Sequence, residues 1–100
     1  MSVQKRISLV ITGKVQGVGY RYSVKLKAES LAIRGYVRNQ LDGSVFVTAQ
    51  GETTALENFV KWCYKGPPTA LVRGIEETPV SIEDFSGFSI LYYKNSPNPS

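Results

Sequence analysis

Residues 13–21, which read GKVQGVGYR, place three glycines and an arginine within one short segment. The glycines allow backbone conformations that other residues avoid, so successive N–H groups can converge on one point. A helix that begins directly after them adds unpaired N–H groups and the positive end of its dipole. Arg21 then stands in the first helical turn, where a cation is unfavourable unless an anion lies nearby, and its guanidinium matches two phosphate oxygens. The segment therefore predicts a phosphate site.

A second interpretation of this segment stays open. It matches neither G-x-x-x-x-G-K-[ST] nor G-x-G-x-x-G, the two common nucleotide-binding patterns. A glycine-rich turn can also simply reverse the chain and leave Arg21 in solvent. From these residues alone, the segment fits an anion site and also a plain turn.

Residue types that the chain lacks narrow the chemistry. The 100 residues include no histidine and one cysteine, Cys63. This excludes serine–histidine and cysteine–histidine catalysis, histidine-ligated zinc, and a disulfide within the chain. Cys63 follows Trp62 in the apolar stripe of a predicted helix, which favours a core residue over a reactive thiol. Any catalysis must then use arginine, amide, hydroxyl, carboxylate or backbone groups, and we expect no metal and no cofactor.

Composition and charge indicate the kind of protein that holds these residues. With 42% hydrophobic and 20% charged residues, the chain is an ordinary globular protein. No apolar run is long enough to span a bilayer or to serve as a signal peptide, so we expect a cytoplasmic protein. The net charge is +4, and residues 1–50 carry eight basic but only two acidic side chains. This basic half suggests an anionic ligand, although a mixed solvated surface gives the same counts.

Hydrophobic periodicity predicts the elements that must position the segment. The predicted strands are residues 5–12, 34–39, 44–50, 69–74 and 88–93, and the predicted helices are residues 21–31 and 53–64. The order β-α-β-β-α-β, with a small extra edge strand, predicts an α+β fold: a ferredoxin-like sandwich in which two helices cover one face of an antiparallel sheet. We expect a single domain over residues 1–93 and a disordered polar tail over residues 94–100.

Two stretches of the chain resemble the signatures of the acylphosphatase family. Residues 13–21 are similar to G-x-V-Q-G-V-G-[FY]-R, and residues 35–45 are similar to G-[WY]-V-x-N-x-x-D-G-[ST]-V. The spacing of 18 residues from Arg21 to Asn39 also fits the family. The likeness extends over about residues 5–92, and both motifs are highly specific.

The resemblance implies an enzyme that hydrolyses the carboxyl–phosphate bond of acyl phosphates to a carboxylate and inorganic phosphate without a metal. It implies that Arg21 binds the phosphate and that Asn39 orients the attacking water, so these two are the expected catalytic residues. The phosphate cradle is expected from the backbone N–H groups of Gln16, Gly17, Val18, Gly19, Tyr20 and Arg21. Because an acyl phosphate has a good leaving group, no strong acid is needed to protonate it. Asn39 cannot act as a base, so we expect the substrate's own phosphate oxygen to serve as the base.

The same resemblance implies the partners. We expect a small acyl phosphate as substrate, inorganic phosphate as product and inhibitor, no nucleic acid, no membrane, and a monomeric chain.

The position of Asn39 close to a hairpin, taken without the resemblance, also fits a residue that simply stabilises a turn. In a strand it shares a face with Gly35 and Val37, and it faces the loop after the first strand if those two strands are neighbours.

Two other functions remain as alternatives. An RNA-binding module of the same fold is one, because Arg34, Gly35 and Tyr36 open like the K/R-G-F/Y signature of such modules. The following residues depart from that signature, and only Tyr36 and Phe46 are available to stack bases. A domain that binds acyl or carbamoyl phosphate without hydrolysing it is the other alternative.

Overall fold

Strand β1 (Gln4–Lys14) alternates polar and apolar residues, and Ile7, Leu9 and Ile11 on its inner side are buried. The computed structural model of the chain describes residues 3–92. Its other elements are α1 (Tyr20–Ser30), β2 (Arg34–Asn39), β3 (Val45–Glu52), α2 (Thr53–Lys65), β4 (Leu71–Val80) and β5 (Phe88–Leu91). The strands form one sheet in the order β4-β1-β3-β2-β5. Strand β1 therefore lies inside the sheet, where both of its edges are paired.

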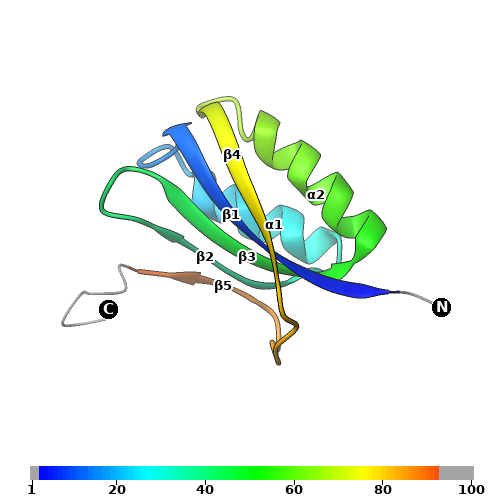
Figure 1. The fold of residues 1–100 in the computed structure, drawn as a ribbon. Helices are drawn as coiled ribbons and strands as arrows, with labels where there is room; N and C mark the ends of the chain where they lie inside the picture. Colours follow the sequence, from blue (N-terminus) through cyan, green and yellow to red (C-terminus); the bar gives the residue numbers. More distant parts are fainter. Residues whose placement is uncertain (1–2, 93–100) are drawn as a thin grey trace.

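Both helices cover the same face of this sheet (Figure 1). Helix α2 buries Leu56, Phe59 and Cys63, which recur at spacings of three and four residues. The core lies between the layers, where Leu9 and Val47 pair across β1 and β3 and are fully buried. The predicted ferredoxin-like α+β fold is confirmed. Within residues 3–92, no helix is long and apolar enough to cross a membrane.

Strand β4 is longer than the sequence predicts. We expected residues 69–74, whereas the strand continues to Val80 and pairs antiparallel with β1. Its second half contains Glu76, Glu77 and Thr78, which are exposed. Because these residues are polar, the hydrophobic pattern does not predict this half of the strand. Its backbone hydrogen bonds to β1, on one side only, form the edge of the sheet without a run of buried side chains.

The sheet is not fully antiparallel, contrary to what we expected, because strand β5 runs parallel to β2. After β4 at one edge of the sheet, residues 81–87 cross the face without helices and reach the opposite edge (Figure 1). Arg6 fixes this crossing by donating a hydrogen bond to the carbonyl oxygen of Ser81 at 2.6 Å. Gln50 does the same for the carbonyl of Glu83 at 2.7 Å. The tail expected over residues 94–100 lies outside the described residues.

Three connections meet at one end of the molecule. The loop between β1 and α1, the turn between β2 and β3, and the turn between α2 and β4 all lie at the end where α1 begins (Figure 1). The predicted phosphate segment belongs to the first of these connections, and Asn39 directly precedes the second. The fold therefore brings the two family-like motifs to the same end of the sheet.

Candidate active site at the start of helix α1

The loop between β1 and α1 depends on two glycines. Gly17 and Gly19 have φ angles of 73° and 78°, in the left-handed region that glycine adopts without strain. A Cβ atom at either position would meet no atom within 4 Å, so the backbone conformation rather than packing requires glycine there. Gly19 is also the residue directly before α1. The loop thus enters the helix through a conformation that other residues rarely adopt.

The backbone N–H groups of residues 16–22 donate to no backbone carbonyl within residues 3–92. The first hydrogen bond of the helix runs from the Ser23 N–H to the Gly19 carbonyl at 3.1 Å. Helix α1 has neither a side-chain cap nor an acidic residue in its first turn. Unpaired N–H groups and the positive end of the helix dipole therefore coincide, which is the physical basis of an anion site.

A cavity of about 210 Å³ opens beside Arg21. It is lined by Val15, Gly17, Gly19, Tyr20, Arg21, Tyr22, Ile90 and Tyr92. The guanidinium carbon of Arg21 lies 5.8 Å from the centre of the Tyr92 ring, a cation–π contact. No carboxylate of residues 3–92 forms an ion pair with Arg21. The cavity thus combines the glycine loop with a guanidinium that no described carboxylate neutralises.

The ring of Tyr20 lies in the core beneath the loop. Its side chain is only 1% exposed, and its hydroxyl donates a hydrogen bond to the Cys63 carbonyl at 2.8 Å. The ring also stacks on Trp62, with 6.2 Å between centroids. Burial raises the pKa of the Tyr20 phenol, and it raises the pKa of the Cys63 thiol to about 12. The predicted core position of Cys63 is confirmed, and the phenol of Tyr20 is already bonded within the core.

The side chain of Gln16 connects the loop to the turn between β2 and β3. Its Nε2 atom donates to the carbonyl oxygens of Gln40 and Ser44, at 2.7 and 2.8 Å. Gln40 directly follows Asn39, so these bonds hold the loop against the end of β2. The sequence predicted only the backbone N–H of Gln16 as part of the site. The reach of its side chain to a turn 24 residues away carries no local sequence signal.

The turn that receives Gln16 is itself held by hydrogen bonds. One carboxylate oxygen of Asp42 accepts from the Ser44 hydroxyl at 2.6 Å and from the Ser44 N–H at 2.9 Å. The amide of Gln40 donates to the Ser44 hydroxyl oxygen at 2.9 Å. The hydroxyl and N–H of Ser44 hold the pKa of the Asp42 carboxyl below its usual value. Gln16 therefore meets a preorganised partner.

Asn39 ends β2 and pairs with Val45 of β3. It lies on the side of the strand that Val37 buries, two residues earlier, as predicted. Its Oδ1 atom is buried, and it is the one buried side-chain polar atom in the described part of the chain without a hydrogen-bond partner. An unpartnered buried acceptor costs about 1–3 kcal/mol. Such a cost calls for an explanation, and a water or substrate bound at this oxygen would supply one.

The structure brings the predicted residues together only in part. Gly17, Gly19, Tyr20 and Arg21 line the cavity, whereas Gln16, Val18 and Asn39 do not. The expectation that Asn39 faces the loop after β1 required β1 and β2 to be neighbours. They are not, because β3 lies between them. The hydrogen bonds of the Gln16 side chain instead connect the loop after β1 to the turn after Asn39. A larger cavity of about 380 Å³, between β1 and α2, contains none of the predicted site residues.

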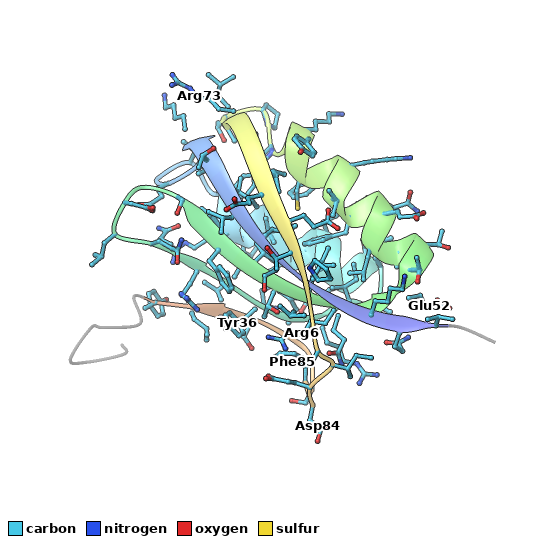
Figure 2. All side chains as sticks on the ribbon, in the orientation of Figure 1. Arg6, Tyr36, Glu52, Arg73, Asp84 and Phe85 are labelled. Atoms are coloured by element: carbon cyan, nitrogen blue, oxygen red, sulfur yellow. The ribbon has the colours of Figure 1, made fainter. Side chains whose placement is uncertain are left out.

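The face of the sheet without helices carries the aromatic residues considered for RNA binding. Tyr36, Arg6 and Phe85 gather on it (Figure 2), and the ring centroids of Tyr36 and Phe85 are 6.3 Å apart. The guanidinium carbon of Arg38 lies 4.5 Å from the centroid of the Phe46 ring. The ring face of Phe46 is therefore already in contact with a side chain of the protein itself.

Comparison with known proteins identifies the family of the chain. The family model of acylphosphatase matches residues 7–90. An acylphosphatase of Acaryochloris marina is 46% identical over 85 residues, which cover 85% of this chain and 91% of that protein. The crystal structure of acylphosphatase from Bacillus subtilis matches with a TM-score of 0.86 and 37% identity, covering 88% of this chain and 99% of that one. An acylphosphatase structure from Coxiella burnetii gives a TM-score of 0.84, also at 37% identity, over 87% and 92% of the two chains. The chain belongs to the acylphosphatase family.

Proposed function

We propose that Arg21, Asn39 and the backbone N–H groups of residues 16–21 carry out the reaction of this family in this chain. The protein hydrolyses the carboxyl–phosphate bond of acyl phosphates, giving a carboxylate and inorganic phosphate. The observation that carries the proposal is the run of N–H groups at the start of α1 that are unpaired within residues 3–92, beside a guanidinium that has no carboxylate partner among the same residues. Both features fit a phosphate dianion.

Arg21 supplies the charge that the reaction needs. The transferred phosphoryl group spreads negative charge over three oxygens, and catalysis consists mainly of positioning and neutralisation. A guanidinium binds two of these oxygens at once through its fork of N–H donors. An arginine that stabilises this transition state contributes about 10³–10⁵ in rate. The N–H groups of residues 16–21 hold the remaining oxygen charge in a fixed frame.

Asn39 orients the water. Its Oδ1 atom is an acceptor without a partner in the part of the chain that the structure describes, so it can receive a hydrogen bond from the attacking water and direct the lone pair of that water at phosphorus. An amide cannot act as a base. The water oxygen bonds to phosphorus while the bond from phosphorus to the acyl oxygen breaks and the carboxylate leaves. The proton of the water passes to a phosphate oxygen of the substrate.

Isotope labelling tests this sequence of bonds. Hydrolysis of an acyl phosphate in ¹⁸O-enriched water is expected to place the label in inorganic phosphate, because the water attacks phosphorus. Label in the carboxylate product instead would mean attack at the carbonyl carbon, and it would contradict the proposed role of Asn39. Mass spectrometry of both products after complete turnover distinguishes the two outcomes.

The same proposal includes the domain that carries the activity, its oligomeric state and its location. The single domain over residues 1–93 carries the activity as a monomer in the cytoplasm, without cofactor, metal, nucleic acid or membrane. Inorganic phosphate binds the same cradle as the substrate and inhibits competitively. A chain shortened to residues 1–93 is expected to keep the full kcat/KM, and phosphate is expected to raise the KM without changing kcat.

A further inference from the structure

The carbonyl oxygen of Val18 accepts a hydrogen bond from the Thr69 hydroxyl at 2.7 Å. Val18 belongs to the loop before α1, whereas Thr69 lies 51 residues later in the turn between α2 and β4. The distance is typical of a good hydrogen bond between a hydroxyl and a carbonyl. This contact fixes the direction of the peptide between Val18 and Gly19.

The direction of that peptide decides what the loop presents to an anion. The described residues contain no cis peptide bond, so the Val18 carbonyl and the Gly19 N–H point in opposite directions. The carbonyl is directed at Thr69, which does not line the cavity beside Arg21. Gly19 does line that cavity. The Gly19 N–H therefore points away from Thr69, and Gly19 itself lines the cavity where the phosphate is proposed to bind.

The glycine makes this peptide able to rotate. Gly19 has φ 78° and ψ 14°, and glycine populates positive and negative φ about equally. A rotation of the peptide by about 180° would replace the N–H by the carbonyl oxygen and present a partial negative charge to the anion. The hydrogen bond from Thr69 exists only while the Val18 carbonyl points at Thr69 and the Gly19 N–H points away from it. It therefore stabilises this orientation of the peptide against rotation.

The turn that carries Thr69 is itself held by hydrogen bonds, so the position of the Thr69 hydroxyl is fixed. The Ala70 N–H donates to the Pro67 carbonyl at 3.0 Å and closes a turn in which Pro68 fixes one central φ angle. Directly before it, the Gly66 N–H donates to the Trp62 carbonyl at 2.7 Å and joins the turn to the end of α2. Thr69 is thus presented by a preorganised segment.

We infer that Thr69 is a positioning residue for phosphate binding, which acts by holding the Gly19 N–H toward the cavity. This inference rests on the proposed phosphate cradle. Thr69 is exposed, so removing its hydroxyl leaves no buried defect in the core. A neutral hydrogen bond of this kind changes an equilibrium about three- to tenfold. The effect should appear in phosphate affinity and in KM together, because the N–H holds substrate and product alike.

The test uses the full chain and inorganic phosphate as the ligand. Phosphate is titrated into ¹⁵N-labelled protein while the amide signals of residues 16–21 are followed by NMR, and kcat and KM are measured with benzoyl phosphate. Thr69→Val and Thr69→Ala remove the hydroxyl, whereas Thr69→Ser keeps it. Thr12→Val is the matched control, since the Thr12 hydroxyl also donates to a carbonyl, that of Gly74 at 3.3 Å, between β1 and β4.

In the wild type, phosphate is expected to shift the Gly19 amide signal. Thr69→Val and Thr69→Ala should raise the phosphate Kd and the KM about three- to tenfold and reduce the Gly19 shift. Thr69→Ser and Thr12→Val should stay within about twofold of the wild type. Unchanged affinity and an unchanged Gly19 shift in the variants without the hydroxyl would overturn the role of Thr69 alone. No loop shift in the wild type would overturn the cradle, and the inference with it.

Discussion

The amide of Gln16 donates a hydrogen bond to the carbonyl oxygen of Ser44 at 2.8 Å, across 28 residues of sequence. The same nitrogen donates to the carbonyl of Gln40 at 2.7 Å. One side chain thereby joins the loop that carries the unpaired N–H groups to the turn that begins directly after Asn39. Since β3 separates β1 from β2, this side chain connects the two proposed halves of the site across a strand that lies between them.

Replacement of Gln16 should uncouple the two halves. Gln16→Ala removes two hydrogen bonds, so the free energy of unfolding is expected to fall by about 1–2 kcal/mol. The kcat/KM should fall at least about tenfold, because small displacements of groups that position a reaction are costly. Gln4→Ala, at an exposed position of β1, is the control and should change neither quantity. An active Gln16→Ala enzyme would show that the turn reaches its position without this bond.

Asn39 should be needed for rate but not for stability. Asn39→Ala is expected to lower kcat by about 10²–10³, because an oriented polar group that acts at the reacting atoms is lost. The free energy of unfolding should change by less than about 1 kcal/mol, because the variant also removes the unpartnered buried oxygen. Turnover kinetics and urea unfolding measure the two effects, with the exposed Asn58→Ala as control. A large loss of stability with little loss of kcat would indicate that Asn39 only shapes the turn.

The turn that receives Gln16 should weaken in acid. The Ser44 hydroxyl and N–H keep the pKa of Asp42 in the folded protein below its unfolded value of about 3.9. This group therefore adds stability above the unfolded pKa, and that stability is lost as the pH falls through the folded pKa. Asp42→Asn should thus lower the urea midpoint more at pH 6 than at pH 2. An equal difference at both pH values would show that the charge of Asp42 is irrelevant to folding.

Cys63 should be inert while the protein is folded. Burial raises the pKa of its thiol to about 12, so only about one thiol in 10⁴ is ionised at pH 8. A thiol reagent such as dithionitrobenzoate is expected to modify Cys63 only as fast as the protein unfolds, and rapidly in 8 M urea. Fast labelling under native conditions, measured by absorbance, would mean that the end of α2 opens locally.

The sequence predicted the fold through its strongest periodic patterns. The alternation in β1 and the three-and-four spacing in α2 mark buried faces, and both elements lie within a few residues of their predicted positions. The second half of β4 was missed because its exposed residues Glu76, Glu77 and Thr78 carry no apolar alternation. The parallel pairing of β5 depends on the crossing of residues 81–87, which bonds between distant residues such as Arg6 and Ser81 hold in place.

The site was predictable where its chemistry is local in sequence. Glycines beside the start of a helix, followed by an arginine, predict an anion site within a few consecutive residues, and the structure places Gly17, Gly19 and Arg21 around one cavity. The contacts that orient this loop come from elsewhere: Gln16 reaches the turn after β2, and Thr69 reaches the Val18 carbonyl. Pairs separated by 24 and 51 residues leave no periodic trace. The buried oxygen of Asn39 likewise becomes distinctive only when its surroundings are known.

The most direct measurement is the hydrolysis of benzoyl phosphate in the presence of EDTA by the wild type, Arg21→Ala and Asn39→Ala. Arg34→Ala is the matched control, because Arg34 begins β2 at the end opposite to Asn39 and is exposed. We expect wild-type turnover to survive chelation and to be matched by Arg34→Ala. Arg21→Ala should lose about 10³-fold or more of kcat/KM, and Asn39→Ala about 10²–10³-fold of kcat. Folded wild type that binds phosphate but does not turn over benzoyl phosphate, or full activity in either site variant, would contradict the proposed mechanism.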